Sequence, residues 1–233
     1  VHREVTGHGG HLAFEIGKGI HASMIIIPEM FNKTQITIDK IVRLIISSMI
    51  KRRIVGQKFG VVVVGEGIFH FLQDEDIASS GITFDYDAHG HPELSEVSKA
   101  HVISKILKNR LKELNLDIIC RPVEVGYSLR CVDPSAFDLT YCTTLGIGVK
   151  KLYDEGHSGC MVAVNLEEEV IPVYLKDVED EHGKIRTRLV NIDKEVVRQT
   201  LAENIYYLTA QDRSLARKWL ADPEPFEYER ILG

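Results

Sequence analysis

The sequence predicts an α/β protein with a largely parallel β-sheet and helices on both of its faces. Three observations predict this class. Short apolar runs rich in β-branched residues alternate with longer segments of helical periodicity along most of the chain. One run, residues 59–64, is continuously apolar, which is typical of a strand covered on both faces. Glycine-rich or polar turns follow several of these runs, as they do at the carboxyl ends of parallel strands.

The size and composition are those of a globular protein with a substantial core. The 233 residues are 44% hydrophobic and 27% charged, which suits one large domain or two small ones. The net charge of −6, without a basic stripe, disfavours a nucleic-acid-binding protein. No apolar run approaches the ~20 residues that span a bilayer. The four cysteines are scattered without C-x-x-C pairs, which favours a reducing cytoplasm.

The first half of the chain is predicted to alternate strands with amphipathic helices. Thr37 is the expected N-cap of a strongly periodic helix, whose last turn carries Lys51, Arg52 and Arg53. These cations complement the negative helix end and are expected to face solvent. We expect strands at 1–5, 24–27, 59–64 and 116–125, and helices at 11–20, 37–53 and 95–114.

The second half is predicted to begin with a tight turn into a long helix. Asp133 is the expected N-cap, and Pro134 the first helical residue, where its missing N–H has no cost. The helix covers 139–155 and is closed by Gly156. We expect strands at 160–165, 170–175 and 186–190, followed by helical structure from 193 onward.

Three loops at predicted strand ends carry the residues best suited to bind a ligand. They are the glycine-rich turn 6–10, the turn 65–67 and the segment 126–138. Guanidinium groups bind phosphate in a bidentate manner, carboxylates accept hydrogen bonds from sugar hydroxyls, and glycines permit close backbone approach. The polar residues in or just before these loops are His8, Glu66, Arg121, Tyr127 and Arg130. This set favours a phosphorylated polyol as the ligand.

Each of these residues also has a purely structural interpretation. Glycine-rich turns between a strand and a helix usually only turn the chain. Glu66 could simply be an acid at a helix start, and Arg121, before a proline, could be a surface residue. Arg130 near a helix start opposes the helix dipole, which makes a structural role for it less favoured. The early histidines lack metal-ligand spacing, so a metal site is disfavoured.

Taken together and in order, four segments resemble the 6-phosphofructokinase family, specifically its pyrophosphate-dependent branch. E-V-T-G-H-G-G-H-L-A at 4–13 is similar to the family's E-V-M-G-R-x-x-G-x-L-A, one residue shorter. I-P-E-M-F at 27–31 resembles I-P-E-E-F. G-V-V-V-V-G-E-G at 60–67, after a basic helix end, resembles G-V-x-V-x-x-E-G. G-Y-S-L-R-C-V-D-P at 126–134 resembles the branch's G-Y-x-x-R-x-x-x-P.

This resemblance implies a fructose 6-phosphate pocket lined by loop residues. Glu66 would accept hydrogen bonds from the sugar hydroxyls, and Tyr127 and Arg130 would hold the 6-phosphate. Arg121 would add positive charge across a subunit boundary. The implied substrate-binding residues are Thr6, Gly7, His8, Glu66, Arg121, Tyr127, Ser128, Leu129 and Arg130.

The resemblance also implies a reaction and a division of the chain. The family, which acts in glycolysis, transfers a phosphoryl group to the sugar's 1-hydroxyl with Mg²⁺, here from pyrophosphate or ATP. The catalytic base, the donor loop and most Mg²⁺ ligands are expected outside this chain, which we interpret as a C-terminal portion of a phosphofructokinase-like fold. Residues 1–125 would form the acceptor domain. Residues 126–233 would return to the donor-side domain and add a C-terminal helical segment. A homo-oligomer, or pairing with the missing N-terminal part, is expected.

Two departures from the family pattern leave alternatives open. Thr6 and His8 replace the family's Met and Arg, so a permanently charged fork becomes a titratable ring. A non-catalytic regulatory subunit that binds a sugar phosphate is therefore a second interpretation. An α/β binding module for an unrelated phosphorylated ligand is a third.

Overall fold

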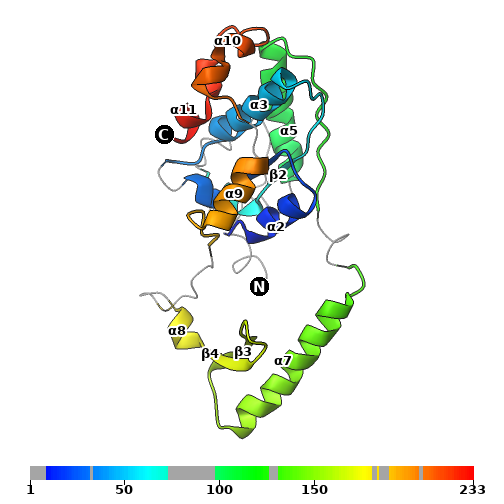
Figure 1. The fold of residues 1–233 in the computed structure, drawn as a ribbon, viewed down its shortest axis with the longest axis vertical. Helices are drawn as coiled ribbons and strands as arrows, with labels where there is room; N and C mark the ends of the chain where they lie inside the picture. The colour runs from blue at the N-terminus through cyan, green and yellow to red at the C-terminus, as the bar shows by residue number, and fades with distance from the viewer. Residues whose placement is uncertain are drawn as a thin grey trace, which may run out of the picture. The chain divides into compact units, whose positions relative to one another are not determined.

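The computed structural model describes residues 9–31, 34–72, 98–125, 131–179, 183, 189–204 and 207–233. The chain divides into two compact units (Figure 1). Unit 1 comprises residues 1–124 and 188–233, and unit 2 comprises residues 125–187. The functional division into domains 1–125 and 126–233 stays a prediction.

Unit 1 contains most of the helices and one pair of strands. Its elements are α2 (His11–Gly19), β1 (Met24–Ile26), η1 (Pro28–Phe31), α3 (Ile38–Ile54), β2 (Val62–Val64), η2 (Glu66–Phe71), α5 (Lys99–Glu113), α9 (Glu195–Asn204), η3 (Ala210–Asp212), α10 (Arg213–Ala216), η4 (Glu224–Phe226) and α11 (Tyr228–Leu232). The elements of unit 2 are α7 (Ala136–Asp154), β3 (Cys160–Val164), β4 (Val170–Tyr174) and α8 (Leu175–Val178). None of the helices in the described part of the chain has the length and apolarity needed to cross a membrane.

The core of unit 1 is built around strand β1. Its three residues are fully buried, and it pairs in parallel with β2, Met24 opposite Val62. Helix α2 packs on both strands, and α3 and α9 pack on β1. A Cβ at Gly17 of α2 would lie 2.4 Å from Cγ1 of Ile25, so this helix approaches the strand closely because the residue is glycine.

Most predicted elements are confirmed, with two corrections to the strands. Thr37 caps α3 by accepting the N–H of Lys40 at 3.2 Å, as predicted. The residues 116–125 form no strand; Ile119 and Val123 are 79% and 76% exposed, and no described strand pairs with this segment. Phe59, predicted to lie within a doubly covered strand, is 81% exposed, and β2 itself is only half-buried.

The predicted sheet also differs in extent. The mixture of helices and strands is confirmed, but the described strands form one parallel pair, β1–β2, and one antiparallel pair, β3–β4. The described residues form no larger parallel sheet. The predicted strand at 1–5 lies outside the described residues, as does most of the one at 186–190.

The cationic end of α3 was expected to face solvent, and this expectation is wrong for Lys51. Lys51 does not simply face solvent, because its Nζ binds both carboxylate oxygens of Asp212 at 2.7 and 2.8 Å. Arg52 donates to the carbonyl oxygen of Phe59, and Arg53 to that of Asp117. The last turn of α3 therefore forms hydrogen bonds with three other segments of unit 1, at Phe59, Asp117 and Asp212.

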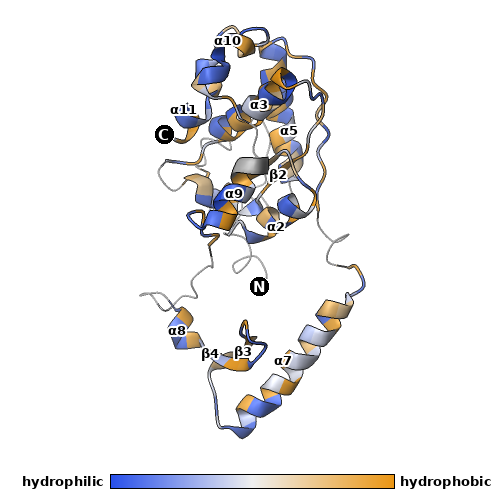
Figure 2. Ribbon diagram, in the orientation of Figure 1, coloured by the Kyte–Doolittle hydropathy of each residue, from blue (hydrophilic) through white to orange (hydrophobic). Residues whose placement is uncertain are grey.

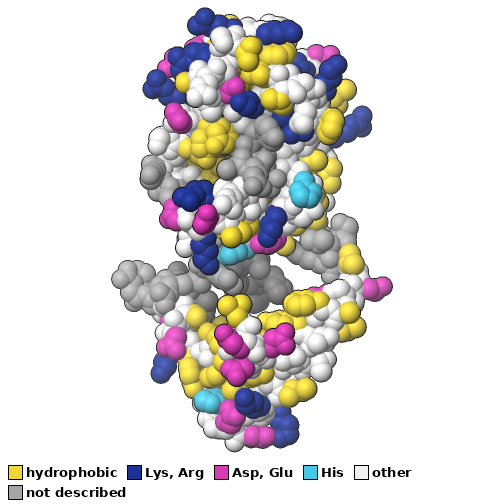
Figure 3. Space-filling model, viewed as in Figure 1, with side chains coloured by type: hydrophobic (Ala, Val, Ile, Leu, Met, Phe, Trp, Pro, Cys, Tyr) yellow, Lys and Arg dark blue, Asp and Glu magenta, His cyan; other side chains and the backbone are white. Residues whose placement is uncertain are grey.

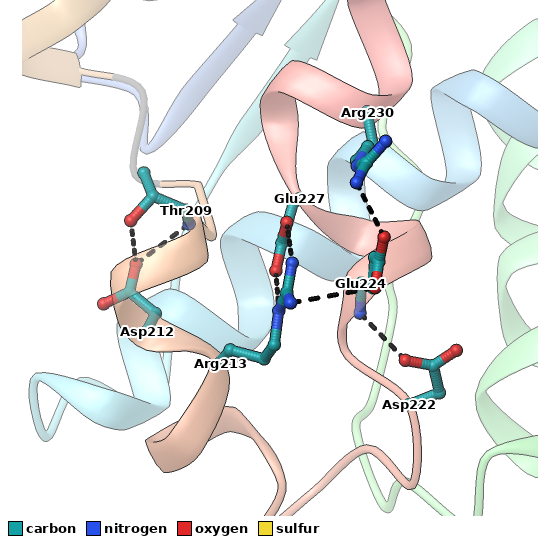
Figure 4. Close-up of polar contacts among 7 residues, drawn as sticks. All are labelled: Thr209, Asp212, Arg213, Asp222, Glu224, Glu227 and Arg230. Carbon is teal, nitrogen blue, oxygen red and sulfur yellow. Dashed lines mark hydrogen bonds and ion pairs between the residues drawn. The ribbon is translucent and has the colours of Figure 1, made fainter.

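A network of ion pairs organises the segment 207–233 (Figure 4). Asp212 closes a capping box with Thr209, whose N–H and hydroxyl both donate to its carboxylate at 3.0 Å. Arg213 binds Glu227 in a bidentate pair at 2.6 and 2.9 Å, and Glu227 is only 4% exposed. This segment packs against α3 through α10, η4 and α11.

Unit 2 consists of a helix packed on a two-stranded hairpin. A Cβ at Gly148 of α7 would lie 2.7 Å from Cγ1 of Val162 and 2.8 Å from Cγ1 of Val170, so the glycine allows close packing. The predicted N-cap Asp133 is wrong. Ser135 caps α7 instead, in a capping box with Asp138, because its hydroxyl is spaced to meet the third helical N–H.

Many apolar side chains of unit 2 are exposed within that unit. Apolar residues recur along α7 (Figure 2), and hydrophobic side chains are spread over the visible face of unit 2 (Figure 3). In α7 only Gly148 and Leu152 are buried. The large exposed apolar residues of α7 and the hairpin are Phe137, Leu139, Tyr141, Ile147, Val149, Tyr153, Met161, Leu166 and Ile171.

Candidate functional site

The carboxyl ends of β1 and β2 meet at one edge, because the two strands are parallel. Each strand is followed by a short 3₁₀ helix, η1 after β1 and η2 after β2, and these two helices contact each other. Helix α2, which packs on both strands, begins directly after the glycine-rich segment. The sequence predicted a ligand site at this edge, and two of its three loops end there.

Glu66 is the first residue of η2 and lies at this edge. Gly65 precedes it and donates its N–H to the carbonyl oxygen of Ile26 at 2.8 Å, which ties the end of β2 to the end of β1. The Glu66 side chain is 57% exposed and forms an ion pair with Lys99. Glu66 is thus both an acid in a first helical turn and a carboxylate open to solvent, so the two interpretations of this residue coexist.

Lys99, which the sequence did not single out, contacts the candidate site through Glu66. It is the first residue of α5, which Ser98 caps by accepting the N–H of His101. The Lys99 side chain is only 23% exposed. It lies 33 residues after Glu66 in the chain, and no local motif links the two. Its ammonium adds positive charge directly beside the candidate sugar-binding carboxylate.

Glu29 is a second residue whose position the sequence did not predict, although the motif I-P-E-M-F contains it. It is 9% exposed and lies in η1. Its carboxylate accepts the N–H of Gly10 at 2.9 Å, at the end of the glycine-rich segment. The same oxygen accepts the N–H of Val190 at 2.9 Å. These bonds fix the backbone where the predicted loop 6–10 leads into α2.

Arg121, in contrast, has no contact that supports its predicted role. It lies in an irregular segment, is exposed, and makes no hydrogen bond or ion pair with another described residue. The other predicted site residues lie outside the described part of the chain: Thr6, Gly7, His8, Tyr127, Ser128, Leu129 and Arg130. Of the predicted set, the structure therefore places Glu66 at the edge of β1 and β2 and leaves Arg121 without a partner in the described ranges.

The described residues contain no group of three or more His, Cys, Asp or Glu side chains placed to hold a metal ion. The four cysteines are free thiols, and burial raises the pKa of Cys120 while nearby Lys108 opposes that rise. In the described residues, the candidate site thus consists of two carboxylates, a lysine and backbone amides.

Comparison with known proteins identifies relatives of this chain. No family model matches the chain. It is 32% identical over 195 residues to the pyrophosphate–fructose 6-phosphate 1-phosphotransferase of Naegleria fowleri, covering 80% of this chain and 44% of that protein. It is 30% identical over 220 residues to the enzyme of the same name from Thermotoga maritima, covering 92% of this chain and 50% of that protein. The chain is a relative of these phosphotransferases.

More distant phosphotransferase relatives extend the comparison to plants. Subunit beta 2 of the pyrophosphate–fructose 6-phosphate 1-phosphotransferase from Arabidopsis thaliana is 21% identical over 229 residues. The match covers 76% of this chain and 40% of that subunit. The predicted resemblance to the pyrophosphate-dependent phosphofructokinases is confirmed. The chain spans about half the length of the first two of these curated phosphotransferases, 44% and 50%.

Proposed function

We propose that this chain supplies the fructose 6-phosphate site of a pyrophosphate-dependent phosphofructokinase. The whole enzyme would transfer a phosphoryl group from pyrophosphate to the 1-hydroxyl of the sugar phosphate, in glycolysis. One observation carries this proposal: 92% of the chain aligns at 30% identity with a phosphotransferase of that name. The position of Glu66 at the carboxyl edge of two parallel strands supports it, because ligands bind at such edges.

Glu66 would bind the sugar hydroxyls. A carboxylate offers two oxygens with about four acceptor positions, so it can hold Lys99 and still accept hydrogen bonds from a ligand. The ion pair with Lys99 would restrict the side-chain rotamers of Glu66, which lowers the entropy lost on binding. The ammonium of Lys99 would also attract the negatively charged sugar phosphate.

The remaining pocket residues are proposed from the resemblance. Tyr127 and Arg130 would bind the 6-phosphate, with Ser128 and Leu129 between them contributing backbone contacts. Arg121 would add charge from a neighbouring subunit. Thr6, Gly7 and His8 would complete the pocket. The hydrogen bond from Gly10 to Glu29 fixes the backbone two residues after His8.

Catalysis would depend mainly on positioning and electrostatics, as phosphoryl transfer generally does. We assign the base, the donor loop and most Mg²⁺ ligands to residues outside this chain, and no step here depends on the metal. The donor is pyrophosphate, with ATP as the variant to test. A cytoplasmic homo-oligomer, or pairing with a separate N-terminal part, completes the proposal. The names of the relatives at 30–32% identity do not favour the non-catalytic alternative.

Thermal unfolding with and without fructose 6-phosphate tests this proposal. A ligand at 100 times its Kd stabilises the folded state by about 2.7 kcal/mol, which raises Tm by several degrees. We expect this shift in the unmodified protein and its loss in Arg130→Ala. Arg217→Ala, at an exposed position of unit 1, is the matched control and should keep the shift. Inorganic phosphate at the same concentration should produce a smaller shift. An unmodified protein whose Tm is insensitive to fructose 6-phosphate would contradict the proposal.

A further inference from the structure

The buried carboxylate of Glu29 lies just after β1 and binds two backbone N–H groups. We propose that Glu29 is a positioning residue: its buried carboxylate fixes the backbone at the entrance of α2 and thereby shapes the sugar-phosphate site. This inference rests on the proposed function. It adds a residue that contacts no substrate and acts through the glycine-rich loop.

One carboxylate oxygen of Glu29 joins three segments that are distant in the sequence. Glu29 itself follows the fully buried strand β1. Its Oε1 accepts the N–H of Gly10, 19 residues earlier, and the N–H of Val190, 161 residues later, both at 2.9 Å. Both bonds are buried. The two backbone segments are therefore held at a fixed separation by a single atom.

The second oxygen of Glu29 indicates that the carboxylate does more than satisfy two amides. Its Oε2 is buried and accepts no hydrogen bond from the described residues. Burying a carboxylate has a high desolvation cost, and a neutral amide of the same shape would satisfy both N–H groups at a lower one. A charged acceptor, however, forms bonds about twice as strong as a neutral one and so holds the backbone more rigidly.

Gly10 shows how closely the loop lies against this carboxylate. A Cβ at Gly10 would lie 2.5 Å from Cβ of Ile27 and 2.6 Å from Oε2 of Glu29, so no side chain fits there. The α2 helix begins at the next residue, with Gly10 as its N-cap. Gly10 is two residues from His8, so a shift of its backbone would displace the predicted Thr6, Gly7 and His8.

The test compares Glu29→Gln with Asp212→Asn in otherwise intact protein. Both changes neutralise a buried carboxylate that binds a backbone N–H, but Asp212 lies in the segment 207–233 and pairs with Lys51. We measure Tm without ligand and the Kd of fructose 6-phosphate by calorimetry. The Tm without ligand shows whether each variant is folded. Only Glu29→Gln should weaken binding, by about tenfold, the factor that 1.4 kcal/mol represents.

A second measurement is independent of the ligand. Amide hydrogen exchange should be about tenfold faster at Gly10 and Val190 in Glu29→Gln, and unchanged at both in Asp212→Asn. Unchanged fructose 6-phosphate affinity in a folded Glu29→Gln protein would overturn the inference. If the unmodified protein does not bind fructose 6-phosphate, the proposed function fails. The exchange rates then decide separately whether Glu29 fixes the loop, and unchanged protection at Gly10 would show that it does not.

Discussion

The two units of the molecule are stabilised in different ways. Unit 1 has a fully buried strand, β1, and helices α2, α3 and α9 packed around it. Beside local ion pairs, it has pairs between residues far apart in sequence, such as Lys51 with Asp212 and Glu66 with Lys99. Unit 2 buries only two residues of its 19-residue helix α7. Its contacts are mostly local: a capping box, a hairpin and the i,i+4 pair of Lys150 with Asp154.

This difference shows that an apolar, periodic helix need not have a core within its own unit. Helix α3 and helix α7 are of similar length, 17 and 19 residues, and both carry many apolar residues. In α3 nine residues are buried, whereas most large apolar side chains of α7 are exposed within unit 2. The same substitution should therefore have different effects in the two helices, and this can be measured.

The largest expected difference concerns isoleucine in the two helices. Ile46 of α3 is 0% exposed, and Ile147 of α7 is 66% exposed. Ile46→Ala should lower the free energy of unfolding by about 2–5 kcal/mol, because it removes buried methyl groups and leaves a cavity. Ile147→Ala should change it by no more than about 0.5 kcal/mol. Urea titration followed by circular dichroism measures both, and equal losses would contradict the comparison.

A smaller difference is expected for two lysine ion pairs. Lys51 and Asp212 have side chains 24% and 11% exposed, whereas Lys150 and Asp154 are 78% and 55% exposed. Lys51→Met should cost about 1.5–3 kcal/mol, the usual value of a hydrogen bond to a charged group with little solvent screening. Lys150→Met should cost at most about 0.5 kcal/mol, since exposed i,i+4 pairs contribute little. The same urea titrations test this; a larger loss in Lys150→Met would reverse the conclusion.

The smallest expected effect is the change in the free energy of unfolding at acid pH that is due to two carboxylates, one in each unit. Burial of Asp212 opposes its ionisation, but hydrogen bonds from Lys51 and Thr209 outweigh burial and hold its pKa below the usual range. Hydrogen bonds from Ser135 lower the pKa of the exposed Asp138. A lowered folded-state pKa means that each carboxylate stabilises the protein above its unfolded-state value of about 3.9. That contribution is lost as the pH falls through the folded-state value.

The measurement is the stability difference between the unmodified protein and each Asn variant. For Asp212→Asn the difference should be constant from about pH 7 to 5 and should shrink below about pH 4. Asp138→Asn should show the same direction with a smaller amplitude, because solvent screens the exposed carboxylate. A difference that grows as the pH falls would contradict the direction given for either pKa.

Local patterns predicted the elements well, since their causes lie within a few residues. The β-branched run at 24–27 and the period of α3, with Thr37 as its cap, required only neighbouring residues. The cap of α7 was wrong for an equally local reason. Asp133 before Pro134 is a favourable cap, but the pair Ser135 and Asp138 satisfies two backbone N–H groups at once.

Features that depend on distant partners could not be predicted in this way. A strand exists only with a partner that receives its hydrogen bonds, so the apolar residues of 116–125 were not sufficient to define one. The candidate site shows the same limit. The sequence identified Glu66 from its turn, but Lys99 and Glu29 became apparent only when the fold showed their contacts.

The attachment of α3 to the segment 207–233 also has a consequence during synthesis. Ser47 accepts the N–H of Leu208 at 2.8 Å, across 161 positions of sequence, and Lys51 binds Asp212 across the same interval. At about 5–20 residues per second, a ribosome needs roughly 8–30 seconds to make that stretch. For this time Ser47 and Lys51 of the nascent α3 lack the partners that they have in the folded chain, so this attachment can form only after Leu208 and Asp212 have been made.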